Sequence, residues 1–438
     1  MDVKEGSQVH GNGRFRNLIF GVRSIAARAA LAMAIVSALT GVLTQSAQAQ
    51  TYTVIYNFTG AQDGAFPEAG VTLDRGGNLY GTTSGPGFGG DVYRLTNQGG
   101  DWVFSPLYHF TGGMGGASPY AKVVFGPDGT LYGTAIAGGD PTCGQCGVAF
   151  NLRPPAAAVC GARLCSWSET VLYAFQGGND GLSPGSGDLV FDQAGALYGM
   201  TTYGGSSCDC GTVYKVTPGG GSWTESVLHR FSNAEGQTPY GGVIFDSTGK
   251  LYGTTSLDVH YDGSVFQLAP AGGGWTITTI HGFTGPSDGG YPISGLISDA
   301  LGNFYGTTSD QGPNGGGTVF ELTPAGASWA FRVLYSFTGN GFGSVGPDGD
   351  LLMDGAGNLY GTTNATGAHN AGTVFKLTRS GGVWTYSLLH EFSGGSDGRW
   401  PVDGLTMDAH GNLYGTTSQG GTSSNCFQGC GVVFEISP

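Results

Sequence analysis

The fold of this chain is decided by the stretch Leu79-Tyr80-Gly81-Thr82-Thr83, which is the first copy of a short motif. The tyrosine of the motif recurs at spacings of 52, 66, 54, 53, 55 and 54 residues. Each tyrosine has a glycine three positions before it and another directly after it. The seven tyrosines are Tyr80, Tyr132, Tyr198, Tyr252, Tyr305, Tyr360 and Tyr414. A near-constant period of about 55 residues is typical of folds built from one repeated supersecondary unit.

Four short apolar segments alternate with turn-rich segments inside each repeat. In the fifth copy they are residues 295–299, 303–308, 317–324 and 329–337. Apolar and polar side chains alternate along them with a period of two, which indicates β-strands. The glycine after each motif tyrosine indicates a bulge or a close backbone approach between blades. Four antiparallel strands in each of seven repeats predict an all-β, seven-bladed β-propeller.

The two ends of the repeat array predict how the ring closes. If the strand with the pattern Gly-Leu-x-x-Asp is innermost, the segment from Trp to Phe is the outermost strand of each blade. After residue 49 the chain opens with a lone outer strand, Tyr52–Phe58, and it ends with a third strand, Gly431–Pro438. We therefore expect the N-terminal strand to complete the last blade and to clasp the ring shut.

Residues 1–49 have the pattern of a secretory signal peptide. A basic stretch through Arg28 precedes a mostly apolar run, Ala29–Leu43, and the small-x-small sequence Ala47-Gln48-Ala49. The apolar run is too short to span a bilayer comfortably. We therefore expect residues 1–49 to be a signal peptide and residues 50–438 to be a single propeller domain with no membrane span. The mature protein would be secreted or periplasmic.

The charge of the chain argues against one class of partner. The net charge is −14, and residues 1–49 contain five basic and two acidic side chains, so the remainder carries −17. Such a surface repels phosphate backbones, and we expect no nucleic-acid partner. The 85 glycines accompany an aromatic content of 12%, which favours turns joining short aromatic strands over a disordered chain.

The repeat resembles a known family, the Gloeo/Verruco (GloVer) tandem repeat of bacterial exported proteins. The resemblance lies in Asp-x-x-Gly-Asn-Leu-Tyr-Gly-Thr-Thr followed by Gly-Gly-Thr-Val-Phe-x-Leu-Thr-Pro, and it covers residues 51–438. It implies export and a repeat array, without a defined biochemical activity.

Eight cysteines occur as four close pairs. The pairs are Cys143/Cys146, Cys160/Cys165, Cys208/Cys210 and Cys426/Cys430. Even pairing in an exported chain favours disulfides. A zinc site would need the first two pairs together, but the strand between them, about residues 147–154, would hold them roughly 25 Å apart. A bridge from Cys143 or Cys146 to Cys208 or Cys210 in the next repeat remains an alternative, because Cys-x-Cys needs a sharp bend to close on itself.

Three columns of the repeat contain residue types that often carry chemistry. For each we favour a structural role: a hairpin cap for the aspartates, and packing for the aromatic and histidine columns. The first column is Asp74, Asp192, Asp246, Asp299, Asp354 and Asp408, with Gly126 in the second copy. The second, which we expect to add a hydrogen bond to its blade-to-blade packing, is Tyr56, Tyr108, Tyr173, His229, His281, Tyr335 and His390. The third is Trp102, Trp167, Trp223, Trp275, Trp329 and Trp384.

The loops between second and third strands vary most among the repeats. They are residues 136–146, 203–210, 256–262, 364–371 and 418–430. They emerge on the same face as the connections from outer to inner strands, and variable loops around a channel mouth are where ligands usually meet a propeller. Repeat-specific candidates for ligand contact on this variable-loop face are Asp258, His260, Asp262, His369, Asp397 and Trp400.

The sequence contains no Ser/His/Asp motif, phosphate-binding loop or Rossmann fingerprint, so we assign no catalytic residue. We also expect no metal and no cofactor. The favoured function is a non-catalytic binding or structural module, a monomer that engages a glycan or an extracellular protein through the variable-loop face. The alternative is an extracytoplasmic propeller enzyme, a glycan lyase, hydrolase or lactonase. That alternative requires carboxylates or histidines of one or two blades to converge on the axis.

Overall fold

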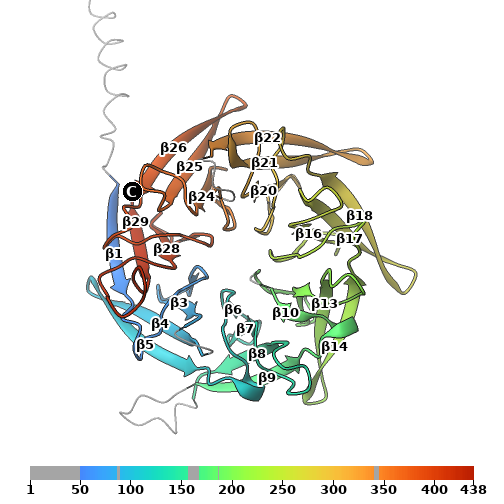
Figure 1. Ribbon diagram of the computed structural model, residues 1–438, viewed down its shortest axis with the longest axis horizontal. Helices are drawn as coiled ribbons and strands as arrows, with labels where there is room; N and C mark the ends of the chain where they lie inside the picture. The colour runs from blue at the N-terminus through green and yellow to red at the C-terminus, as the bar shows by residue number, and fades with distance from the viewer. Residues whose placement is uncertain (1–49, 86–88, 156–166, 186, 340–344) are drawn as a thin grey trace, which may run out of the picture. The chain divides into compact units, whose positions relative to one another are not determined.

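Seven antiparallel sheets, one for each copy of the repeat, surround a central axis (Figure 1). The computed structural model describes residues 50–85, 89–155, 167–185, 187–339 and 345–438. Within it, Thr51–Ser437 form one compact unit. The predicted all-β, seven-bladed propeller is confirmed. The predicted signal peptide, residues 1–49, lies outside the described residues and stays a prediction.

In blades 1 to 6 the four main strands follow one another in the order of the chain, whereas blade 7 takes its outer strand from the N-terminus. We number the blades by the order of the motif tyrosines. Blade 1 contains β2 (Thr72–Leu73), β3 (Leu79–Thr83), β4 (Asp91–Gln98) and β5 (Asp101–His109). Blade 2 contains β6 (Val124–Phe125), β7 (Leu131–Ala135), β8 (Val148–Arg153) and β9 (Ser168–Ala174). Blade 3 contains β11 (Val190–Phe191), β12 (Leu197–Tyr203), β13 (Thr212–Gly219) and β14 (Ser222–Arg230), and β10 (Leu182–Pro184) also pairs with β12. Blades 4 and 5 contain β15 (Ile244–Phe245), β16 (Leu251–Thr255), β17 (Ser264–Ala271) and β18 (Gly274–Gly282); and β19 (Ile297–Ser298), β20 (Phe304–Thr308), β21 (Gly315–Ala325) and β22 (Ser328–Thr338). Blades 6 and 7 contain β23 (Leu352–Met353), β24 (Leu359–Thr363), β25 (Thr373–Ser380) and β26 (Val383–Glu391); and β27 (Thr406–Met407), β28 (Leu413–Thr417) and β29 (Val432–Ser437) with β1 (Thr51–Asn57).

The only helices in the described ranges are two short 3-10 turns, η1 (Gly113–Gly115) and η2 (Gly178–Asp180). No helix in this part of the chain has the length and apolar character that crossing a membrane demands.

The clasp is formed as the two chain ends predict. Strand β1 pairs antiparallel with β29, so that Thr51 lies opposite Ser437 and Asn57 lies opposite Val432. The ring of Tyr52 stacks on that of His390 in blade 6, with 3.7 Å between the ring centroids. The blue N-terminal strand beside β29 in Figure 1 is therefore the outer strand of blade 7. Closure removes a free interface between the first and last blades.

The motif strand is the most buried part of each blade. In β20, all five residues are buried, because the strand has a sheet partner on each side and a neighbouring blade on each face. Gly306 lies directly opposite Phe320 of β21, and a Cβ atom on Gly306 would come within 2.6 Å of the Phe320 ring. The interpretation of this glycine as a bulge or an approach between blades is wrong. The ring that covers it belongs to its own blade, and the pairing of β20 with β21 has no break.

The innermost strands are shorter than the sequence pattern suggests. In blade 5, residues 295–299 were expected to form the strand, but only Ile297 and Ser298 pair with β20. The segment before them turns toward the axis, where the backbone N–H of Gly295 donates a hydrogen bond to Asp350 of blade 6 at 2.6 Å. The inner segments therefore hold one another as well as their own sheets.

Candidate functional site

The inner segments approach one another so closely at the axis that glycine is required at several positions. A Cβ atom on Gly404 would lie 2.7 Å from the backbone oxygen of Asp350, and one on Gly70 would lie 2.5 Å from the oxygen of Gly404. Both glycines occupy the position four residues before the turn-aspartate column. Gly242 and Gly295 occupy it in blades 4 and 5.

Three blades break this glycine column with a charged residue: Lys122, Asp188 and Asp350 in blades 2, 3 and 6. The ammonium nitrogen of Lys122 lies 2.9 Å from a carboxylate oxygen of Asp188, and the Lys122 side chain is only 12% exposed. A third carboxylate, Asp403 of blade 7, accepts a hydrogen bond from the backbone N–H of Gly70 at 2.6 Å. We call these four charged side chains the axial charge cluster.

The electrostatics of the axial charge cluster are those of one cation shared by several acids. Burial by itself would lower the pKa of Lys122, but Asp188, Asp403 and Asp350 together raise it, so the ammonium stays charged. Burial raises the pKa of Asp350 to about 7, with Lys122 opposing that rise. Burial also raises the pKa of Asp188. The single ammonium thus compensates part of the negative charge of the acids around it.

Two further acids, Glu68 and Asp348, line the same part of the channel. Burial raises the pKa of each to about 7. Asp348 accepts a hydrogen bond from the side-chain amide of Asn364 at 2.7 Å. The cavity that these acids share with the cluster has a volume of about 40 Å³, whereas pockets for small molecules measure roughly 300–1,000 Å³. It has room for a few water molecules, not for a sugar or a lactone.

Sequence reasoning missed the axial charge cluster. The signal was present, because aligning the repeats shows three charged residues in a column that is otherwise glycine. In the ranges that the structure describes, no group of three or more His, Cys, Asp and Glu side chains has the geometry to hold a metal ion.

The predicted ligand-contact residues of blade 4 lie together in one loop. The carboxylate of Asp258 accepts hydrogen bonds from the backbone N–H groups of His260 at 2.8 Å and Asp262 at 3.3 Å. Asp262 accepts another from the side-chain amide of Gln311 at 2.6 Å. The imidazole of His260 is exposed, with its Nδ1 3.7 Å from Asp258. The two acids therefore shape the loop, and His260 is the member that faces solvent.

The other predicted contact residues belong to blade 6 and the connection into blade 7. Asp397 accepts a hydrogen bond from the backbone N–H of Ser393 at 2.8 Å and lies 3.4 Å from His390. Trp400 has its ring covered by the Arg399 guanidinium at 4.3 Å from the ring centroid. His369 is exposed on its loop. Hydrogen bonds and ion pairs among the described residues join neither His369 nor Trp400 to the blade 4 loop.

The column that contains His281 has the packing role that we favoured. The His281 ring stacks on Phe331 of the next blade, with 3.8 Å between centroids and 3° between ring planes. Its Nε2 lies 3.1 Å from the carboxylate of Asp288 in the connecting loop. Tyr56 with Asp63 and Tyr173 with Asp180 repeat this hydrogen bond at 3.0 and 2.9 Å.

The turn aspartates cap hairpins, as predicted. Asp299 accepts hydrogen bonds from the backbone N–H groups of Leu301 at 2.9 Å and Asn303 at 3.0 Å. Its second oxygen accepts one from the hydroxyl of Tyr305 at 3.1 Å. Burial would raise the pKa of Asp299, but these hydrogen bonds, together with one from the side-chain amide of Asn303 at 2.7 Å, lower it.

Three cysteine pairs lie within their own loops. The Cα atoms are 5.9 Å apart in Cys143/Cys146, 5.2 Å in Cys208/Cys210 and 5.1 Å in Cys426/Cys430. In each pair the two sulfur atoms lie together, and this geometry favours pairing within a loop over the bridge between blades 2 and 3. The fourth pair, Cys160 and Cys165, lies outside the described residues. Oxidation of the pairs stays a prediction.

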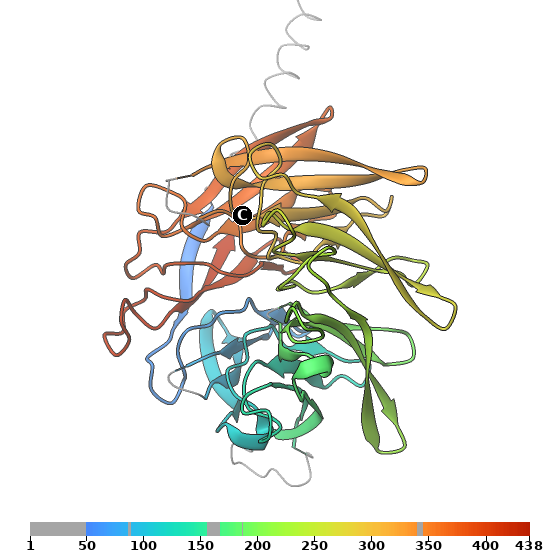
Figure 2. The same ribbon diagram turned by 45° about the vertical axis from the view of Figure 1, so that its right-hand side comes forward.

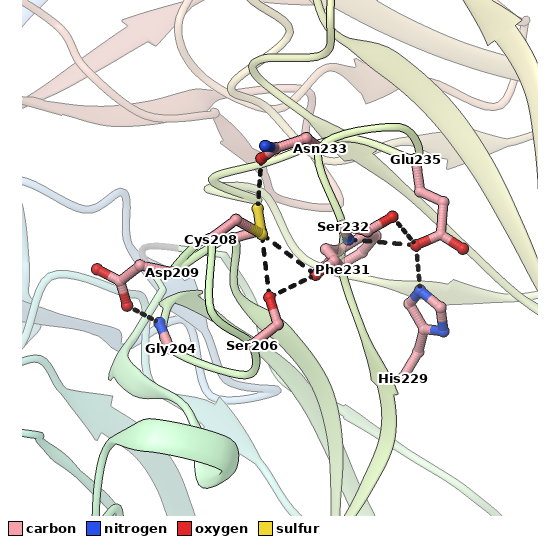
Figure 3. The surroundings of a disulfide bond; sticks show 10 residues. Gly204, Ser206, Cys208, Asp209, His229, Phe231, Ser232, Asn233 and Glu235 are labelled. Atoms are coloured by element: carbon pink, nitrogen blue, oxygen red, sulfur yellow. Dashed lines mark hydrogen bonds and ion pairs between the residues drawn. A yellow bond between two sulfur atoms is a disulfide. The ribbon is translucent and has the colours of Figure 1, made fainter.

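Figure 3 shows the surroundings of the Cys208/Cys210 pair. The hydroxyl of Ser206 lies 3.0 Å from the sulfur of Cys208 and donates to the backbone oxygen of Phe231 at 2.9 Å. The sulfur of Cys210 lies 3.2 Å from the side-chain oxygen of Asn233. These contacts tie the variable loop of blade 3 to the connection that leaves its outer strand.

Solved structures with a similar fold are known. The structure is similar to the extracellular domain of a putative hybrid two-component system from B. thetaiotaomicron, with a TM-score of 0.52, 12% identity, and coverage of 88% of this chain and 39% of that one. This chain therefore spans about two fifths of that domain. It is also similar to a putative 6-phosphogluconolactonase from Bacteroides uniformis, with a TM-score of 0.46, 14% identity, and coverage of 73% and 84%. At these identities the likeness concerns the fold alone.

No curated protein matches the sequence. Residues 163–300 and 258–438 match the Gloeobacter/Verrucomicrobia repeat, so that the two matches together run from residue 163 to the last residue. The protein belongs to the Gloeobacter/Verrucomicrobia repeat family.

Proposed function

We propose that this protein is an exported, non-catalytic binding module that engages an extracellular protein through its variable-loop face. The observation that carries the proposal is the exposure of large apolar side chains on that face. Met114 is 75% exposed, Tyr261 is 70% exposed and Phe427 is 84% exposed. Each lies on a different connection at the side of the ring where second strands end. Exposed aromatic and methionine side chains are enriched where proteins bind one another.

The construction of these loops supports the same function. Phe427 sits between Cys426 and Cys430, and the side-chain amide of Asn425 donates to the backbone oxygen of Thr59 at 2.8 Å. The loop is therefore held against the clasp segment instead of being free in solution. A side chain presented on a fixed loop loses little conformational entropy when it binds.

The axial cavity weighs against the enzyme alternative. Its acids do converge from several blades, as a propeller enzyme would require, but they share one cation and about 40 Å³ of space. A substrate would have to displace the inner segments, which are close-packed at glycine. The size of this cavity favours a structural role for the cluster.

The proposal is tested by site-specific photo-crosslinking in the native host. A benzophenone amino acid replaces Phe427 in one variant and Tyr261 in another; Val383, which is exposed on the opposite face, serves as the matched control. We expect one protein to be crosslinked from positions 427 and 261 and not from 383. When the crosslinked partner is purified, the triple variant Met114→Ser, Tyr261→Ser, Phe427→Ser should bind that partner at least tenfold more weakly than the wild type does. Equal crosslinking from both faces, or none, would overturn the proposal.

Export is tested separately. We expect the protein in the periplasmic or secreted fraction, with N-terminal sequencing starting at residue 50. A cytoplasmic protein that retains residues 1–49 would contradict the location.

A further inference from the structure

A groove lies between blades 4 and 5 on the face opposite the variable loops. Its cavity measures about 680 Å³, which is the size of a small-molecule site. Residues 245–250 of blade 4 line one side, and residues 298–302 and 324–329 of blade 5 line the other. The hairpins that join third to fourth strands, yellow and orange in Figure 2, project at this side of the ring.

The lining of this groove departs from the repeat at three positions. Phe304 stands where the other six blades have leucine, and Lys250 stands where four blades have asparagine. Gln267 of β17 stands in a column that is charged in five other blades. Those five residues are Arg94, Lys215, Glu321, Lys376 and Glu435. Three departures from the repeat in one groove indicate that this groove has a role beyond the packing of the blades.

Two of the charged residues of that column, both lysines, cover the motif tyrosine in other grooves. The ammonium groups of Lys215 and Lys376 each lie 5.0 Å above the ring of a motif tyrosine. The two blades with an amide in this column are blade 2, with Asn151, and blade 4, with Gln267. The grooves that follow these two blades hold cavities of about 520 and 680 Å³. In both grooves the column thus provides a neutral amide in place of a charged side chain.

One wall of the groove between blades 4 and 5 is aromatic. Phe304 packs against Tyr252 with 4.3 Å between ring centroids and against Trp329 with 5.3 Å. Leucine at position 304 would not extend this wall. Phe304 and Tyr252 are only 2% and 3% exposed, so the ring that reaches the groove is the half-buried Trp329, which rests on them. Its exposed part can pack against the C–H face of a pyranose ring, whose hydrogens carry partial positive charge toward the π-face.

The polar groups beside this wall are suited to hydroxyl groups. The side-chain oxygen of Gln267 accepts hydrogen bonds from the hydroxyl of Tyr252 at 2.9 Å and from Lys250 at 3.4 Å. The amide nitrogen of Gln267 donates to no group among the described residues. Asp246 and Asp299 also line the groove, and their negative charge opposes an anionic ligand.

We propose that the groove between blades 4 and 5 is a binding site for neutral saccharides, in which one sugar ring lies on Trp329, supported from beneath by Phe304, and its hydroxyls bind Gln267 and Lys250. The site is separate from the variable-loop face and does not depend on the function proposed for it.

The test is calorimetric titration of residues 50–438 with neutral hexasaccharides: cellohexaose, xylohexaose, mannohexaose and maltohexaose. We expect at least one to bind and trigalacturonate, which is anionic, not to bind. Gln267→Lys and Phe304→Leu install the residues of other blades, so the fold should tolerate both. Gln267→Lys should weaken binding at least tenfold with little change in melting temperature, and Phe304→Leu, which removes the support beneath Trp329, should weaken it by a smaller factor.

Trp384→Ala is the matched control for Trp329→Ala, because Trp384 meets the motif tyrosine Tyr305 in the next groove as Trp329 meets Tyr252. We expect only Trp329→Ala to lose binding. Failure of all four hexasaccharides to bind, or equal losses in the two tryptophan variants, would overturn the proposal. Loss of binding in Met114→Ser, Tyr261→Ser, Phe427→Ser, with the groove variants unaffected, would place the sugar on the variable-loop face instead.

Discussion

Replacement of Lys122 by methionine removes the cation of the axial charge cluster while keeping most of the side-chain volume. At 2.9 Å from Asp188, and with an effective dielectric constant of about 20, the attraction to this one carboxylate is about 6 kcal/mol. Part of it offsets the desolvation of the two charges. Loss of one partner of a buried ion pair costs about 3–5 kcal/mol, because the remaining charge stays buried without compensation. We therefore expect Lys122→Met to lower the free energy of unfolding by about 3–5 kcal/mol at pH 8.

The loss should depend on pH. In the variant, Asp188 and Asp350, whose pKa values burial already raises, escape their mutual repulsion by binding protons, so the destabilisation should shrink as the pH falls to 5. Urea unfolding at both pH values, followed by tryptophan fluorescence, measures the difference. Arg75→Met, at an exposed position, is the control and should change stability by about 0.5 kcal/mol or less. A Lys122→Met loss below about 1 kcal/mol, or one equal at both pH values, would refute the account of the cluster.

Three further predictions concern the axis and the clasp. Burial raises the pKa of Asp348 to about 7, so its contribution to stability is full below the unfolded pKa of about 4 and is lost as the pH rises through 7. The stability of Asp348→Asn relative to wild type should therefore grow by about 2–4 kcal/mol between pH 4 and pH 8. A difference in urea unfolding that does not change with pH would contradict this. Gly404→Ala should lower stability by about 1–3 kcal/mol, because its Cβ would lie 2.7 Å from the Asp350 oxygen, whereas Gly355→Ala, with open space around it, should be nearly neutral in the same assay. Deletion of residues 51–57 should leave β29 as an open edge and turn a single calorimetric transition into a broad one with concentration-dependent aggregation; a sharp transition at the wild-type temperature would show that the clasp is dispensable.

The repeat explains why so much of the fold could be read from the chain. Strand positions depend on local alternation and on turn residues, and Asp299 caps its hairpin through hydrogen bonds within four residues. The clasp could be predicted as well, because a lone outer strand at one end and a missing one at the other leave a single way to complete blade 7. The inner strands were overestimated, since hydrogen bonds between blades, such as that from Gly295 to Asp350, compete with the ladder inside the blade.

The candidate sites were less accessible to the same reasoning. The predicted contact residues were chosen because they break the repeat in the loops, and Asp258 and Asp397 proved to be caps of those loops. The axial charge cluster breaks the repeat in the inner segments, where a single residue changes and the loop length does not. A column of glycines with three exceptions indicates an unusual position, but not that its members meet.

The sequence by itself determined the number of blades, the strands of each blade, and the closure of the ring by β1. These follow from the spacing of the tyrosine motif, from the alternation of apolar and polar residues, and from the strands of the repeat at which the array starts and ends. Only the tertiary structure decided that Lys122, Asp188 and Asp350 interact, because these residues come from three blades, of which blades 2 and 6 are far apart in the chain, and meet only at the axis. It also decided that Phe304 and Gln267, from adjacent blades, border one open groove. The physical reason is the same in both cases. Contacts within a blade depend on neighbours along the chain, whereas the axis and the grooves exist only once seven blades have closed around them.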